Sequence, residues 1–154
     1  MRLRNIVWWA IFFILAIPAQ MLLPGIDILV VGLIIAMQER KPLQIIWVLI
    51  ISMLLQEGQG TMDFGASFCW YGLTMFIYYI GRAIFETENI FFILLVCASL
   101  GVLHFGLMQV LSGLQGVSLP FRRLALESVG EMLIVPVLWL ALHKLRRGVA
   151  RHAD

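Results

Sequence analysis

Six runs of apolar residues, separated by short polar breaks, constrain this chain more than any other feature of its sequence. The runs cover residues 6–23, 26–37, 43–55, 64–80, 90–111 and 124–142. A helix of about 20 apolar residues, within a range of about 17–25, crosses the hydrocarbon core of a bilayer. The sequence therefore predicts an all-α integral membrane protein with about six transmembrane helices, of which the second and third are short.

The composition supports a membrane protein and excludes several other classes. The chain has 154 residues, of which 62% are apolar and 13% are charged. Soluble domains are about 45–50% apolar and about 25% charged, and a small soluble fold cannot hide so much apolar surface. The excess predicts lipid contact, which excludes a soluble enzyme and a disordered tail. The net charge of +2 is also too small for a nucleic-acid-binding domain.

The second and third runs leave two arrangements open. The second run has 12 residues, which as a helix reach about 18 Å. The polar break 38–42 separates it from the third run. The pair forms either two short, tilted helices or one re-entrant hairpin, whose backbone is tolerated at membrane depth when protein covers it. We favour two short helices within a single polytopic domain, residues 1–154.

The distribution of Lys and Arg predicts the orientation, because cytoplasmic loops are enriched in these residues. With the N-terminus inside, the outer side carries Arg122 and Arg123, and all the other Lys and Arg residues lie on the inner side. We therefore expect a multi-pass membrane protein with both termini in the cytoplasm. The segment 143–154 then forms a basic cytoplasmic tail that attracts anionic headgroups. The predicted interfacial anchors on the inner side are Trp8, Trp9 and Trp139.

Two ionisable residues lie within predicted spans, where such groups are costly. His104 precedes Leu111, near the outer end of the fifth run, by seven residues, and Glu131 follows Leu124 by seven residues in the sixth. At about 1.5 Å per residue, both lie about 10 Å below the outer boundary. Equal depth on consecutive helices predicts that they can pair. The pair is either a proton relay or ligand site, or a polar clamp worth about 1–2 kcal/mol or less.

Three charged residues share one face of the sixth predicted helix, because Arg123, Glu127 and Glu131 are spaced four residues apart. Arg123 can pair with Glu127 near the outer surface. The stripe either lines a cavity or docks a basic partner helix, or else its ion pair holds the helix end among the headgroups. On the fifth run, Gly101 and Gly106 predict a smooth packing surface, although no G-x-x-x-G motif is present.

Nothing in the sequence predicts a catalytic, cofactor or metal site. Asp27 opens the second run, where a carboxylate favours a helix N-terminus. Glu57 and Asp63 flank a Gly-rich loop, and we interpret them as solvated loop residues rather than an acid–base or metal pair. Cys69 and Cys97 stand far apart and form no C-x-x-C motif.

The order of these segments resembles the rod shape-determining protein MreD family. The resemblance is carried by the polar loop 56–65, the aromatic segment 64–82, the long segment 90–111, and Val135-Pro136 followed by the basic stretch 143–147. It implies a non-catalytic membrane subunit of the bacterial cell-elongation machinery, which builds the peptidoglycan of the lateral wall. It further implies an MreC-like bitopic protein, the actin-like MreB and peptidoglycan synthases as partners.

The resemblance implies that the subunit docks to partner helices in the membrane. We expect the fifth and sixth helices to make that contact, because they hold the candidate residues Gly101, His104, Gly106, Arg123, Glu127 and Glu131. An alternative is the substrate-capture subunit of an energy-coupling-factor vitamin transporter, which has a similar layout. Such subunits tend to carry A-x-x-x-A in the first helix, a spacing that is missing here. An intramembrane enzyme using His104, Glu127 and Glu131 would lack any recognised constellation.

Overall fold

The computed structural model describes residues 3–23, 25–58, 65–87, 89–116 and 120–151. Within these ranges the regular structure is entirely helical, which confirms the predicted fold class. The elements are α1 (Leu3–Leu22), α2 (Leu29–Gln38), α3 (Pro42–Gly58), α4 (Ala66–Ile84), α5 (Ile90–Gln115) and α6 (Phe121–Arg151). Among the described residues, three helices are long and apolar enough to cross a membrane, namely α1, α5 and α6.

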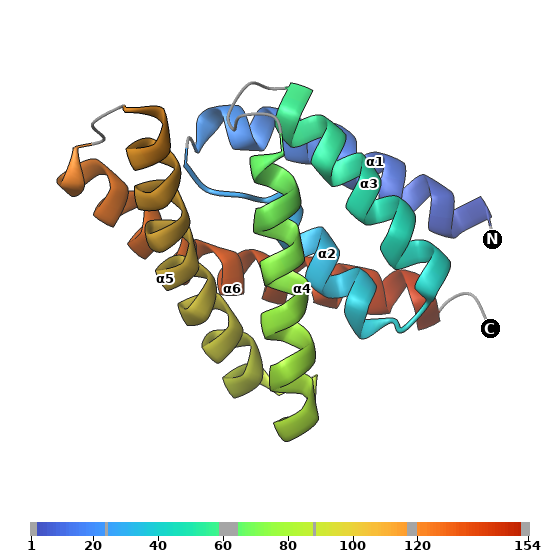
Figure 1. Cartoon of the computed structure of the whole chain (residues 1–154). Helices are drawn as coiled ribbons and strands as arrows, with labels where there is room; N and C mark the ends of the chain where they lie inside the picture. Colours follow the sequence, from blue (N-terminus) through green and yellow to red (C-terminus); the bar gives the residue numbers. More distant parts are fainter. Residues whose placement is uncertain (1–2, 24, 59–64, 88, 117–119, 152–154) are drawn as a thin grey trace.

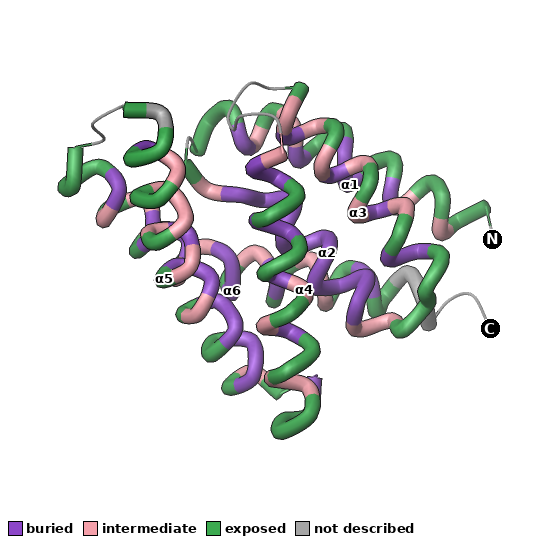
Figure 2. The backbone as a smooth tube through the Cα atoms, in the orientation of Figure 1, coloured by how far each residue is buried: buried purple, intermediate pink, exposed green. Residues whose placement is uncertain are grey.

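The helices surround α2, which lies at the centre of the molecule (Figure 1). It packs against α1, α3, α4 and α6, while α5 packs between α4 and α6. Every residue from Leu29 to Met37 is buried, and the tube in Figure 2 is continuously purple there. A helix that is apolar on all sides is a core helix. Its ten residues reach about 15 Å, so protein rather than lipid surrounds it.

The outer faces of the surrounding helices remain apolar. Large side chains that are more than half exposed include Ile14, Phe76, Phe91, Val102 and Leu133. Figure 2 shows exposed positions recurring along α1, α3, α4 and α5. So much apolar surface on the outside of a small protein is favourable when the surrounding medium is lipid. The structure therefore agrees with the composition in describing a membrane protein.

The basic segment that follows the sixth apolar run is helical as far as Arg151, because α6 continues into it. The structure differs from the sequence prediction for two of the three tryptophans. Trp9 and Trp139 are 1% and 2% exposed, so they are core residues rather than interfacial anchors. Trp9 packs edge-on against Trp47 with ring centroids 5.4 Å apart. The indole N–H of Trp139 donates a hydrogen bond of 2.9 Å to Gln38.

Candidate functional site

The first polar cluster forms where the C-terminal ends of α1 and α3 meet the start of α2 and α4. We call it the Asp27 cluster, and its members are Gln20, Asp27, Gln56, Trp70, His104 and Glu131, all of them buried. The six residues come from five different helices and from the turn before α2. The helices bring them together because each carries a polar residue at the same depth of the bundle.

Asp27 is the anchor of this cluster. Its Oδ1 accepts hydrogen bonds from the backbone N–H groups of Leu29 and Val30, at 2.9 and 3.3 Å. The carboxylate therefore caps the start of α2, as the sequence predicts. Its Oδ2 accepts a 2.8 Å hydrogen bond from the indole N–H of Trp70 on α4. A buried carboxylate requires such donors, because burial without them is costly.

Gln20 extends the cluster to α1 and α3. Its side-chain amide donates hydrogen bonds of 3.1 Å to Asp27 Oδ1 and of 3.1 Å to Gln56 Oε1. The sequence reasoning missed Gln20 and Trp70. The signal that could have found Gln20 is a polar residue near the end of the first apolar run, seven residues before Asp27.

His104 and Glu131 meet at the α5–α6 interface. His104 Nδ1 lies 3.2 Å from Glu131 Oε2, which is ion-pair distance, but the groups are not aligned as a hydrogen bond. Glu131 is completely buried and packs against the backbone of Asp27. Within the described part of the chain, neither Glu131 oxygen has a hydrogen-bond partner. Two carboxylates and an imidazole in one buried site can hold a proton or a small polar ligand.

The ion pair predicted between Arg123 and Glu127 is present at the start of α6. Arg123 Nε donates to Glu127 Oε1 at 2.8 Å. The Arg123 side chain is 70% exposed and that of Glu127 is 21% exposed. A Cβ placed on Gly25 would lie 2.4 Å from Glu127 Cγ, so the turn before α2 passes directly over this side chain. The stripe therefore spans from the surface, at Arg123, to the buried cluster, at Glu131.

The two glycines predicted to form one packing surface on α5 have different environments. Gly101 faces α6 at a very close approach, where an added Cβ would lie 2.7 Å from the backbone oxygen of Ser128. Gly106 is exposed, and an added Cβ there would meet nothing within 4 Å among the described residues. Gly106 therefore does not join Gly101 in the contact with α6, because α5 turns that face away from α6. Gly101, His104 and Glu131 are already engaged inside the chain.

The second polar cluster, which the sequence reasoning missed, lies at the opposite end of α2. We call it the Arg146 cluster, and its members are Asn5, Gln38, Glu39, Gln44 and Arg146. Arg146 Nε donates to Glu39 Oε1 at 2.5 Å, and Arg146 Nη2 donates to Glu39 Oε2 at 3.1 Å. The same Nη2 donates to Asn5. Arg146 therefore links α6 to the start of α1 and to the turn after α2 at this end of the bundle.

Other donors complete the surroundings of Glu39. Gln44 donates to Glu39 Oε2 at 2.8 Å, and Lys41 Nζ lies 3.4 Å from the same oxygen. Burial raises the pKa of Glu39, but the hydrogen bonds from Arg146 and Gln44 and the charges of Arg146 and Lys41 outweigh it. The net result is a pKa below the ordinary value of 4.5. The Arg146 guanidinium also stacks 4.6 Å from the ring centroid of Trp8.

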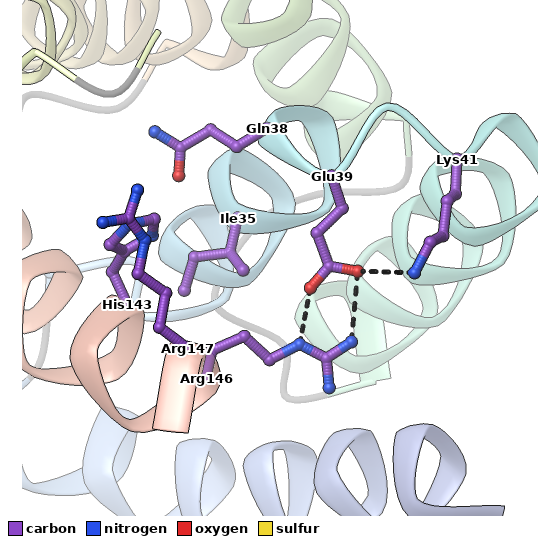
Figure 3. Close-up of a pocket in the computed structure, with 7 residues that line it drawn as sticks. All are labelled: Ile35, Gln38, Glu39, Lys41, His143, Arg146 and Arg147. Atoms are coloured by element: carbon purple, nitrogen blue, oxygen red, sulfur yellow. Dashed lines mark hydrogen bonds and ion pairs between the residues drawn. The ribbon is translucent and has the colours of Figure 1, made fainter. Parts of the chain in front are cut away.

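A cavity of about 300 Å³ lies beside the Arg146 cluster. Figure 3 shows His143, Arg146 and Arg147 on its α6 side, with Ile35, Gln38, Glu39 and Lys41 from α2 and the following turn on the other. Two Arg side chains and one Lys side chain therefore line it together with one carboxylate.

An apolar groove of about 280 Å³ separates α1 from α6 on another side of the molecule. We call it the α1–α6 groove, and its lining residues are Trp8, Ile11, Phe12, Leu15, Ala16, Ala19, Ile28, Leu138, Ala141, Leu142 and Leu145. Along α1 it extends from Trp8 to Ala19, which corresponds to about 16 Å of helix. Three alanines among the lining residues make it accessible to another helix.

The acidic residues flanking the Gly-rich loop do not form a site in the described structure. Glu57 Oε1 accepts a 2.6 Å hydrogen bond from the Ser67 hydroxyl and a 3.0 Å bond from the Gly65 N–H. These two bonds lower the pKa of Glu57, and they link the end of α3 to the start of α4. Asp63 lies outside the described residues. No group of three or more His, Cys, Asp or Glu residues in the described ranges could hold a metal ion.

Comparison with known proteins adds no relative to this description. No family model, no curated protein and no solved structure matches the chain. The proposals below therefore depend on the residues and on the geometry described above.

Proposed function

We propose that this chain is a non-catalytic subunit of the bacterial cell-elongation machinery and works by docking the membrane helix of a partner protein. The observation that carries the proposal is the α1–α6 groove, together with the order of segments that resembles MreD. Helix association in lipid depends on close van der Waals packing, for which interfaces use small residues. Ala16, Ala19 and Ala141 provide such a surface between two helices that present bulkier side chains at the rim.

The occupant we propose is the single membrane helix of an MreC-like bitopic protein. A groove about 16 Å long follows roughly half the thickness of a bilayer core, which suits one helix crossing α1 and α6. The actin-like MreB and the peptidoglycan synthases would join the same assembly. This proposal places the docking surface on α1 and α6 rather than on α5 and α6, because Gly101, His104 and Glu131 face the protein interior.

We also propose that the chain crosses the cytoplasmic membrane six times with both termini inside. Two observations support this topology. The turn after α2 contacts the start of α1 and the end of α6 through Glu39, Asn5 and Arg146. If α2 and α3 each cross the membrane, the turn between them lies on the same side as the start of α1 and the end of α6. A hairpin that turned back midway through the membrane would not reach that side. In the irregular backbone before α2, Asp27 and Ile28 are buried, and the Asp27 carboxylate accepts hydrogen bonds from the first backbone N–H groups of the helix, as depth in a membrane requires.

The test is capture of the partner from detergent-solubilised cells with tagged variants. Ala141→Leu fills the groove, and Ala98→Leu makes the same change at an exposed position on α5 outside it. We expect wild type and Ala98→Leu to recover a single-pass wall-synthesis protein. Ala141→Leu should recover about tenfold less of that protein, or less still, which corresponds to about 1.4 kcal/mol of binding free energy. Equal recovery by both variants, or equal loss in both, would contradict docking in the groove.

The Asp27 cluster favours a second candidate, the substrate-capture subunit of an energy-coupling-factor vitamin transporter. Its buried polar atoms without hydrogen-bond partners in the described structure include Gln20 Oε1, His104 Nε2 and both Glu131 oxygens. A polar ligand could supply those partners. Melting of the purified protein with a panel of vitamins discriminates the two functions, since a ligand-dependent rise in Tm and capture of an ATPase module would support transport.

A further inference from the structure

We propose that the cavity beside the Arg146 cluster binds the phosphate of an anionic phospholipid headgroup. This site is separate from the α1–α6 groove and does not depend on the proposed function. Its cationic side chains come from two parts of the chain that are distant in sequence, Arg146 and Arg147 on α6 and Lys41 after α2. They converge because α6 continues past the apolar run and Arg146 holds it against the turn.

The charge balance of the cavity favours an anion. Lys41, Arg146 and Arg147 contribute three positive charges, and Glu39 is the one carboxylate in the lining. The hydrogen-bond donors around Glu39 favour its ionised form, so Glu39 counts as one negative charge. Without counting His143, the formal charges of the lining sum to +2, which matches a phosphodiester better than a neutral headgroup.

Arg146 gives the site a fixed centre. Its side chain is 10% exposed, and it is held by Glu39 and by the ring of Trp8. A preorganised guanidinium loses little freedom when an anion arrives. The Lys41 side chain is 64% exposed, so its ammonium can move toward a phosphate oxygen. Binding then requires no rearrangement of the helices.

The depth of the cavity matches a headgroup rather than a soluble ligand. Its floor includes Ile35, which belongs to the fully buried part of α2, and its rim begins at Gln38 where the polar turn starts. On α6 the cationic residues follow directly after the apolar run that ends at Leu142. The boundary between hydrocarbon and water therefore passes through the cavity. At about 300 Å³ it is at the small end of the range for ligand pockets.

The experiment measures binding of phosphatidylglycerol to the full chain in phosphatidylcholine nanodiscs or detergent, by native mass spectrometry and by the rise in Tm. The test variant is Lys41→Gln/Arg147→Gln. The control, Lys144→Gln/Arg40→Gln, removes two positive charges from the same end of the molecule but from outside the cavity lining. A single variant, Arg147→Gln, tests the site if the double variant folds poorly in phosphatidylcholine.

We expect phosphatidylglycerol to bind wild type and the control similarly, and to bind the test variant about tenfold more weakly or worse. Equal weakening in test and control variants would show diffuse attraction and overturn the site. If inorganic phosphate or glycerol 3-phosphate raised the Tm as much as the lipid does at equal concentration, the ligand would be a soluble phosphate. That result would overturn the lipid assignment. An equal response of wild type to phosphatidylcholine and phosphatidylglycerol would also overturn it.

Discussion

Two buried carboxylates in the Asp27 cluster are stabilised in different ways. Asp27 receives hydrogen bonds from two backbone N–H groups, from Gln20 and from Trp70. Glu131 is more deeply buried, and its nearest polar side chain is His104 at 3.2 Å. Removing a single donor from Asp27 leaves the others in place. Glu131 has fewer polar neighbours, namely His104 and the backbone of Asp27, so its pairing with His104 is the more sensitive contact.

We predict that His104 and Glu131 are energetically coupled. His104→Leu and Glu131→Leu should each lower the free energy of unfolding by about 1–3 kcal/mol, because each leaves a buried polar partner uncompensated. The double variant should cost less than the sum, with a coupling of about 1 kcal/mol. Reversible unfolding in mixed micelles measures all four proteins. Strict additivity would show that the two side chains do not pair.

The exposed pair Arg123–Glu127 is the control for the measurement on His104 and Glu131. Arg123 is largely exposed, and surface ion pairs contribute little to stability. Arg123→Ala should therefore leave the free energy of unfolding essentially unchanged. A measurable loss would indicate that the start of α6 is held by contacts other than those described.

We predict that the Arg146–Glu39 contact makes stability depend on pH in the acid range. The pKa of Glu39 is lowered in the folded protein, so the folded state favours the ionised carboxyl. This contribution is present above the ordinary pKa of 4.5, and it is lost as the pH falls below that value through the folded pKa. Tm measured from pH 6 downward should fall less steeply in Glu39→Gln than in wild type. Parallel curves would exclude this contribution of Glu39.

Helix packing explains why two glycines of α5 have different roles. At Gly101 the backbones of α5 and α6 approach so closely that a Cβ would lie 2.7 Å from the backbone oxygen of Ser128. At Gly106 the helix surface is open. A glycine in an exposed helix interior costs about 0.5–1 kcal/mol relative to alanine, whereas overpacking a close contact costs about 1–3 kcal/mol.

We therefore predict opposite signs for the same substitution on one helix. Gly101→Ala should lower the free energy of unfolding by about 1–3 kcal/mol, and Gly106→Ala should leave it unchanged or raise it by up to about 1 kcal/mol. Unfolding in mixed micelles checks both variants under one set of conditions. A stabilising Gly101→Ala would contradict the close α5–α6 approach.

At the level of elements, the sequence predicts which segments are helical and not how each helix is rotated. The apolar runs locate all six helices, and Asp27 predicts the start of α2 because capping is a local interaction. The Trp70–Asp27 and Arg146–Glu39 contacts join residues 43 and 107 positions apart. Such contacts depend on the rotation of each helix, which an almost uniformly apolar sequence does not determine. The same uncertainty explains why the sequence does not separate the environment of Gly106 from that of Gly101.

The burial of α2 could have been predicted from its sequence by combining its length with its composition. The run 29–37 carries no polar residue on any side. A lipid-facing helix can have this pattern, but ten residues are too few to cross alone. The combination of shortness and all-round hydrophobicity indicates a helix enclosed by others. Its enclosure explains why the two polar clusters lie at its two ends, among the surrounding helices.

The whole molecule is organised along α2, with the Asp27 cluster at its start and the Arg146 cluster at its end. Longer helices around it present apolar faces outward, and α1, α5 and α6 are each long enough to cross a bilayer. The contact of Arg146 with Asn5 and Glu39 places the start of α1 and the end of α6 at one end of the molecule. This arrangement agrees with both termini emerging on one side of a membrane.

Cysteine labelling in intact cells measures this topology most directly. With Cys69 and Cys97 replaced by alanine, single cysteines are placed before Leu3, at Glu86, at Arg122 and after Asp154. A membrane-impermeant maleimide should label Arg122→Cys from outside, and should reach the other three positions after the cells are opened. Labelling of either terminus from outside, or recovery of the folded protein in water without detergent, would contradict a membrane protein with both ends in the cytoplasm.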